Sequence, residues 1–250
     1  MDNSRKNDND LIVGRNCVTE ALRSGRPIDK IFVAKGGAPS ISPIIAKAKK
    51  SGIVIKEVDG KKLDYLSGGA VHQGVLAFAA AKEYVSVEDI LNIADEKGQP
   101  PFLLILDEIE DPHNLGAIIR TAECTGVHGV IIPKRRSAGL SFSADKASAG
   151  AVEYVPVARV TNLAQTIDML KTKGLWIYGA DMDGECYCKA DLTGGAALVI
   201  GSEGKGIGRL VKEKCDCILS LPMSGKINSL NASVAAGVLM YEFARQRQGF

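Results

Sequence analysis

Residues 196–247 read AALVIGSEGKGIGRLVKEKCDCILSLPMSGKINSLNASVAAGVLMYEFARQR, and most of the chain's recognisable chemistry collects at two turns of this stretch. The apolar run that ends at Ile200 has the length and the branched side chains of a buried parallel strand. The turn Gly201 to Gly206 holds three glycines, which let backbone amides approach a ligand closely. The order strand, glycine-rich turn, helix, strand, loop and long helix predicts an α/β fold.

The glycine-rich turn does not match the common nucleotide-binding loops. A Walker phosphate loop would need glycine at position 199 and Ser or Thr after Lys205, but Val199 and Gly206 stand there. A dinucleotide fingerprint would need a third glycine where Arg209 lies. Two interpretations stay open, a ligand loop of another type and a plain strand-to-helix turn with Glu203 in solvent.

The second turn carries more polar side chains than a helix start requires. A strand is expected at Leu219 to Met223, followed by a polar loop and a helix that opens near Ser229 and Asn231. Capping of the helix amides accounts for one of these two side chains and leaves the other unexplained. The helix then shows a face of small residues that would allow another helix to approach closely: Ala232, Ala235, Ala236 and Gly237.

These segments resemble a known family. GSEGKGIG, LSLPM and SLNAS are similar to motifs two and three of the SpoU (TrmH-like) RNA ribose 2′-O-methyltransferases, and DEIEDPHNLGAIIRTA at residues 107–122 is similar to motif one. Three motifs in the family's order make the resemblance specific, and it extends over residues 11 to 247. It implies S-adenosylmethionine as the cofactor, a homodimer, and a catalytic domain tied in a deep trefoil knot, although knots are very rare in proteins.

The resemblance also implies roles for individual residues. Gly201, Leu221 and Leu230 would contact the cofactor, with Ile200, Met223 and Gly225 nearby and Ala180 as a further candidate. The polar residues expected around the ribose and its phosphate are Asn114, Arg120, Glu203, Ser229 and Asn231. In relatives the arginine equivalent to Arg120 has been proposed to take the hydroxyl proton. A guanidinium offers donors only, so a phosphate clamp is the easier role, and the role of Arg120 stays open.

Residues 11–82 are expected to form a small α/β domain, because helical and strand patterns alternate there over short segments. This part resembles the L30e-like domain that binds the RNA substrate in many SpoU enzymes. The expected division is a disordered head (1–10), this domain (11–82), a linker (83–100) and the knotted methyltransferase domain (101–250). The candidate RNA-binding residues are Arg15 in the first domain and Lys134, Arg135 and Arg136 in the second.

The second domain begins with the apolar run Phe102 to Leu106 and continues as alternating strands and helices. Further strands are expected at 127–132, 152–157 and 175–180, with helices at 115–124, 143–150 and 162–171. The βα alternation predicts a mostly parallel sheet covered by helices on both faces.

Composition limits the class of protein. The formal net charge is only +2, so contacts with RNA would have to come from local basic patches. No run approaches 18 apolar residues and the first ten residues are polar, which predicts a cytoplasmic protein without a membrane anchor. The six cysteines lack zinc-ligand spacing, so free thiols and no bound metal are expected.

The function predicted from the resemblance is methyl transfer to a ribose 2′-hydroxyl of RNA, with a guanosine of 23S rRNA as the favoured target. The alternatives within the class are transfer to tRNA, to an rRNA adenosine or to a base. An alternative of another class is a non-catalytic RNA-binding protein, in which the first domain would do the work. Such a protein would tolerate the loss of Asn114, Arg120 or Asn231, and all three are present.

Overall fold

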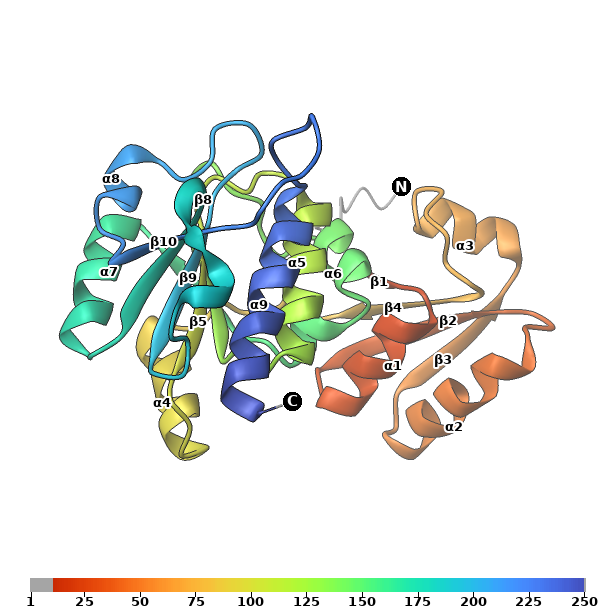
Figure 1. The fold of residues 1–250 in the computed structure, drawn as a ribbon. Helices are drawn as coiled ribbons and strands as arrows, with labels where there is room; N and C mark the ends of the chain where they lie inside the picture. The colour runs from red at the N-terminus through yellow and green to blue at the C-terminus, as the bar shows by residue number, and fades with distance from the viewer. Residues whose placement is uncertain (1–10, 250) are drawn as a thin grey trace.

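The computed structural model describes residues 11–249 and contains two α/β units, each built on its own sheet (Figure 1). The first sheet has the order β1-β4-β2-β3, in which β4 runs antiparallel to both of its neighbours. Helices α1 and α2 cover one face of this sheet, and α3 covers the other. The elements are β1 (Leu11–Val13), α1 (Arg15–Ser24), β2 (Ile28–Ala34), α2 (Ser42–Lys50), β3 (Val54–Val58), α3 (Gly60–Leu66) and β4 (Val75–Ala79).

The second sheet has six strands in the order β10-β8-β9-β5-β6-β7, and every pairing within it is parallel. Its two central strands, β5 and β9, bury all their residues, as parallel strands covered on both faces do. The expected parallel sheet is therefore confirmed. The strands are β5 (Phe102–Leu106), β6 (Gly129–Pro133), β7 (Val157–Val160), β8 (Trp176–Cys186), β9 (Ala196–Ile200) and β10 (Cys217–Ser220).

Helices cover both faces of the second sheet (Figure 1). One face carries α5 (Pro112–Cys124), α6 (Phe142–Ser148) and α9 (Ala232–Gln248), and the other carries α4 (Val87–Glu96), α7 (Leu163–Thr172) and α8 (Arg209–Lys212). Phe102 stacks on Phe243 with ring centroids 4.5 Å apart, which joins β5 to α9. On α5 a glycine is required at Gly116, because a Cβ there would overlap the backbone and side chains of α6.

Three strand predictions need correction. The stretch 152–157 is not a strand: a 3₁₀ turn occupies Ala151–Glu153, and β7 starts at Val157. Val152 lies in this turn and Val155 just after it, and both are buried, so the sequence there resembles that of a strand. The strand expected at 219–223 lies at 217–220, since Pro222 has no amide hydrogen to continue the ladder. The strand expected at 175–180 extends to Cys186.

The four expected segments can be compared with the structure only in part. The predicted head, residues 1–10, lies outside the described residues. The predicted linker contains α4, which packs on the second sheet where Ile90 lies against Gly129. The knot expected from the resemblance stays a prediction. Among the described residues, no helix is long and apolar enough to cross a membrane.

Candidate active site

A cavity of about 580 Å³ opens at the carboxyl ends of β8, β9 and β10. The loops that follow β9 and β10 lie at the upper end of the molecule in Figure 1, beside the first turns of α5 and α9. Six of the seven cofactor residues expected from the sequence line this cavity, and Gly225 lies in the same loop but is not among the lining residues. The six are Ala180, Ile200, Gly201, Leu221, Met223 and Leu230.

The glycine-rich turn forms a tight hairpin on the cavity wall. Ser202 and Gly206 exchange two backbone hydrogen bonds of 3.1 and 2.9 Å. A Cβ on Gly201 would overlap the backbone of Gly206, so any other residue at position 201 would push the hairpin apart. The end of the turn is fixed by Asp107, whose Oδ2 accepts the Gly208 amide hydrogen at 2.8 Å. Burial raises the pKa of the Asp107 carboxyl above its ordinary value.

One polar cluster brings the three sequence motifs together. Glu203 Oε1 accepts hydrogen bonds from the side-chain amides of Asn114, at 3.2 Å, and of Asn231. It also accepts the backbone amide of Ala232 at 3.2 Å. Asn231 Nδ2 donates to Asn114 Oδ1 at 3.0 Å. Glu203 therefore orients both asparagines at the edge of the cavity.

Asn231 has a second function as the N-cap of α9. Its Oδ1 accepts the backbone amides of Ser233, at 2.9 Å, and of Val234, at 3.3 Å. Ser229 does not cap the helix and instead lines the cavity. The surplus of polar residues at this turn is thus explained, because one side chain caps the helix and another faces the cavity.

Charged residues that the sequence analysis did not single out also line the cavity. Lys212 Nζ lies 2.9 Å from Asp181 and 3.7 Å from Asp183. Partial burial acts to raise the pKa of Asp181, but hydrogen bonds from Lys212 and the backbone outweigh it and hold that pKa below its ordinary value. Lys205 and Arg209 lie on the same wall. The sequence could have indicated Asp181, because this residue directly follows the strand expected at 175–180.

Arg120 is not among the residues that line the cavity. It lies on the exposed side of α5, six residues after Asn114, and six residues place two side chains on different sides of a helix. The expectation that Glu203 orients Asn114 or Arg120 is met for Asn114, with which it shares a hydrogen bond.

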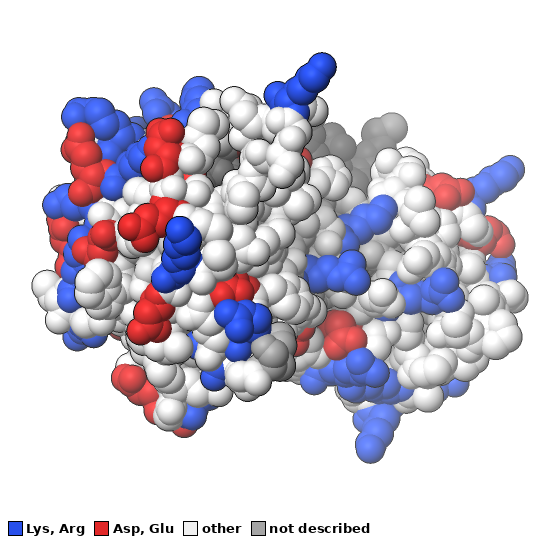
Figure 2. All heavy atoms as spheres, in the orientation of Figure 1, with Lys and Arg blue, Asp and Glu red and all other residues white. Residues whose placement is uncertain are grey.

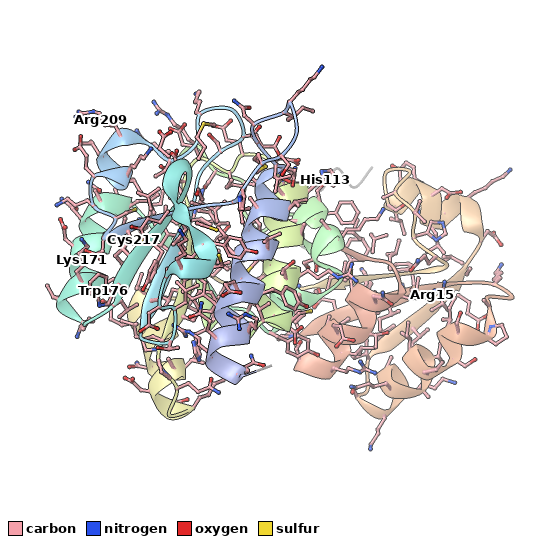
Figure 3. The ribbon with its side chains drawn as sticks, in the orientation of Figure 1. Arg15, His113, Lys171, Trp176, Arg209 and Cys217 are labelled. Atoms are coloured by element: carbon pink, nitrogen blue, oxygen red, sulfur yellow. The ribbon has the colours of Figure 1, made fainter. Side chains whose placement is uncertain are left out.

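The expected RNA-binding residues lie in two separate places. Lys134, Arg135 and Arg136 are exposed in the loop after β6, and Arg136 Nη1 lies 2.9 Å from Glu108 Oε1. Arg15 begins α1 in the first unit, where its guanidinium donates to Ser40. Figure 3 shows Arg15 far from His113, which marks the start of α5 beside the cavity.

The described part of the chain contains no group of three or more His, Cys, Asp or Glu side chains placed to hold a metal ion. None of the six cysteines forms a disulfide, although the sulfur atoms of Cys186 and Cys188 lie 3.1 Å apart.

A parallel sheet with a ligand-sized cavity at the carboxyl ends of its strands defines an α/β protein that binds a small molecule at that edge. Comparison with known proteins gives the class more closely. The SpoU rRNA Methylase family matches residues 101–241, and the family described as RNA 2′-O ribose methyltransferase substrate binding matches residues 11–85. The chain belongs to the SpoU methyltransferase family.

Individual relatives agree with this assignment. YacO, a TrmH family protein of Bacillus subtilis, is 52% identical over 240 residues, which are 95% of this chain and 96% of YacO. A TrmH family protein of Staphylococcus aureus is 49% identical over 239 residues, with the same coverage. AviRb from Streptomyces viridochromogenes, a SpoU methyltransferase whose structure contains S-adenosylmethionine, has a similar fold. Its TM-score is 0.80 at 23% identity, covering 96% of this chain and 91% of AviRb.

Proposed function

We propose that the protein transfers a methyl group from S-adenosylmethionine to a ribose 2′-hydroxyl of RNA, and that its target is a guanosine of 23S rRNA. The observation that carries the proposal is the cluster of Glu203, Asn114 and Asn231, which joins all three SpoU motifs at the rim of one cavity. The family descriptions, which name rRNA and RNA ribose, favour RNA as the substrate. We place this activity in the cytoplasm.

The cavity fits the cofactor in size and in chemistry. Leu219, Leu221 and Leu239 give it an apolar wall, and the exposed Leu230 and Met223 add apolar surface at its mouth. Backbone amides of the glycine-rich turn and the charges around Lys212 supply polar contacts. Bound there, S-adenosylmethionine would supply a methyl group that its sulfonium already makes electrophilic.

The protein then has mainly to position the ribose and to manage one proton. Asn114, held by Glu203 and Asn231, has a second amide N–H with which it holds the ribose beside the cavity, and Asn231 acts by positioning Asn114. A guanidinium supplied by Arg120 binds the phosphate next to the target ribose, and the hydroxyl proton passes to that phosphate or to a water molecule.

A homodimer would bring Arg120 to a site. Arg120 is exposed on α5, and the neighbouring helix α9 exposes Val234, Val238 and Tyr241. Figure 2 shows few charged side chains over the part of the surface where α9 faces the viewer. An uncharged surface with exposed apolar side chains is typical of a protein–protein contact. We therefore assign Arg120 to the partner's site, residues 11–82 to RNA binding and residues 101–250 to transfer.

Methyl transfer from radiolabelled S-adenosylmethionine tests the proposal directly. Protein-free, unmodified large-subunit rRNA and bulk unmodified tRNA are offered separately, and the labelled nucleoside is identified. We expect 2′-O-methylguanosine in rRNA. Label in tRNA alone would keep the chemistry and reject the rRNA target, and no label in either RNA would favour a non-catalytic binder.

Cofactor binding is tested by Gly201→Ala, with Gly194→Ala as the control. A methyl group at position 201 overlaps the backbone of Gly206, whereas a methyl group at position 194 meets nothing within 4 Å. Calorimetry should show that Gly201→Ala weakens S-adenosylmethionine binding by at least about 100-fold, since a displaced hairpin loses several contacts of about 1 kcal/mol each. Equal affinity in the two variants would show that the cofactor binds elsewhere.

A further inference from the structure

A second cavity, of about 290 Å³, adjoins the cofactor cavity and shares the wall formed by Ser202, Glu203 and Lys205. Its remaining lining comes from the loop after β5 and the first turn of α5: Glu108, Ile109, Glu110, Asp111 and Asn114. If the proposed function holds, the target 2′-hydroxyl must lie at the shared wall, next to Asn114 and Glu203. The base attached to that ribose then has the second cavity as the nearest hollow beside the first one.

Glu108 and Lys205 stand together in this second cavity with opposite charges. Glu108 Oε1 lies 2.9 Å from Arg136 Nη1, and Oε2 lies 3.9 Å from Lys205 Nζ. The Glu108 side chain is 28% exposed and Lys205 is 84% exposed. Arg136 therefore holds the carboxylate in place. A carboxylate has about four acceptor positions, so both oxygens can accept further hydrogen bonds.

The backbone of Glu108 adopts a conformation that non-glycine residues seldom use, with φ at +56°. Arg136, its partner, has φ at +55°. The two strained residues are joined by the 2.9 Å ion pair, which fixes the direction of the Glu108 carboxylate. A carboxylate whose direction is fixed can accept hydrogen bonds selectively.

We propose that Glu108 and Lys205 read the Watson–Crick edge of the target base, and that the base they select is guanine. Guanine presents one acceptor, O6, followed by two donors, N1–H and the 2-amino group. The Lys205 ammonium can donate to O6, and the two Glu108 oxygens can accept from N1–H and the amino group. Lys205 reaches the base from the shared wall and Glu108 from the loop after β5, with their charged groups 3.9 Å apart.

The other bases present the wrong order of groups to this pair. Adenine and cytosine would place an amino group against the Lys205 ammonium and a ring-nitrogen lone pair against Glu108. Uracil would offer one donor between two carbonyl oxygens, so one Glu108 oxygen would face an acceptor. Unmatched polar groups of this kind are costly in a partly closed site, which is why the pair discriminates.

The proposal also limits the state of the RNA. The Watson–Crick edge is available to a protein only when the nucleotide is unpaired or turned out of its helix. The substrate class is therefore a guanosine in a loop or bulge, presented with its base splayed from the neighbouring stack.

The experiment begins with wild-type protein and unmodified large-subunit rRNA transcript, or with tRNA if only tRNA is labelled. The methylated position is mapped, and the RNA is then rebuilt with inosine or 7-deazaguanosine at that position. Inosine lacks the 2-amino group, and 7-deazaguanosine keeps the whole Watson–Crick edge. We expect inosine to lower kcat/KM by about 10-fold or more, which is the lower range for a lost base contact, and 7-deazaguanosine to leave it unchanged.

The protein side is tested with Glu108→Gln and Lys205→Met, and with Glu96→Gln on α4 as a matched exposed control. Glu108→Gln should lower kcat/KM for guanosine about 10- to 100-fold and reduce the ratio of guanosine to adenosine methylation, with unchanged affinity for S-adenosylmethionine. Arg136→Ala, which releases the Glu108 carboxylate but removes no contact with the base, should lower the preference for guanosine over inosine by less than Glu108→Gln does.

The outcomes separate this inference from the proposed function. A wild-type protein that methylates no RNA rejects the proposed function. A wild-type protein that methylates RNA, but yields a 2′-O-methylated adenosine, cytidine or uridine, rejects the guanine reading alone. Equal rates on guanosine and inosine, or unaltered base preference in Glu108→Gln, also overturn the reading and leave methyl transfer intact.

Discussion

Two polar clusters, each centred on one glutamate, are built in opposite ways. At the rim of the 580 Å³ cavity, Glu203 is exposed and receives hydrogen bonds from neutral amides. Between the two α/β units, Glu153 is buried, with its side chain 1% exposed, and it pairs with Arg26 at 2.8 Å and Lys82 at 3.4 Å. Neutral partners leave Glu203 able to orient the groups that we propose meet the substrate, whereas the ionic partners of Glu153 join the two α/β units.

The joint between the units has a further carboxylate that differs from both. Asp145 is 8% exposed, and its Oδ1 has no hydrogen-bond partner among the described residues. Burial, followed by repulsion from Glu153, raises the pKa of Asp145 to about 6. Burial of a charge is therefore compensated by two cations at Glu153 and costs stability at Asp145, whereas the site proposed for chemistry keeps its carboxylate open to solvent.

Glu153→Ala is expected to have the largest effect on stability. The change leaves Arg26, whose side chain is 8% exposed, without its partner in the joint. Removing one member of a buried ion pair costs about 3–5 kcal/mol of the free energy of unfolding. Denaturant unfolding measures this, with Glu213→Ala as the control, since Glu213 pairs with Arg209 on the surface. A loss below about 1 kcal/mol would mean that the joint does not depend on the pair.

Glu203→Ala should reverse this pattern. The free energy of unfolding should fall by less than about 1 kcal/mol, because the side chain is exposed. Methyl transfer should fall by about 100-fold, since Asn114 and Asn231 lose the acceptor that orients them. Single-turnover rates and unfolding curves on the same preparations test both statements. A stable variant with full activity would remove Glu203 from the site.

Asp145→Asn should change stability by an amount that depends on pH. Because the folded pKa lies above the ordinary value of 3.8, the folded protein binds this proton more tightly than the unfolded chain does. Stability is therefore lost as pH rises from about 4 to 6, and the full cost, about 2 to 3 kcal/mol, is present above that window. Asparagine carries no charge at any pH, so the variant should gain stability at pH 8.

The matching measurement is the melting temperature of wild type and Asp145→Asn from pH 4.5 to 8. The two curves should converge toward the acid end and separate as pH rises. A constant difference across this range would show that Asp145 does not titrate within it.

Much of the fold followed from local pattern. The continuous apolar runs of β5 and β9 predicted buried parallel strands, because a strand covered on both faces has no polar side to alternate with. The stretch 152–157 failed for the same physical reason, since buried valines in a 3₁₀ turn look like a strand when their partners are unknown. What distinguishes the two is the contact of Glu153 with Arg26, more than 120 residues away.

The candidate site divides in the same way. A helix cap at Ser229 or Asn231 and a tight turn at Gly201 could be expected, because capping and close backbone approach are local properties, and the structure selects Asn231 as the cap. The ion pair of Glu108 with Arg136 could not, because neither residue lies in a pattern that names its partner. The outward direction of Arg120 likewise depends on which face of α5 packs against the sheet.

The sequence by itself determined the buried central strands, the glycine-rich turn and, through three motifs, the family. Only the tertiary structure decided that Asn114 meets Glu203 across 89 residues of sequence and that Asn231 joins them. The physical reason is the separation along the chain of the groups that interact. Backbone geometry and capping depend on neighbours along the chain, whereas a hydrogen bond between distant side chains exists only after the parallel sheet has aligned the carboxyl ends of β5 and β9.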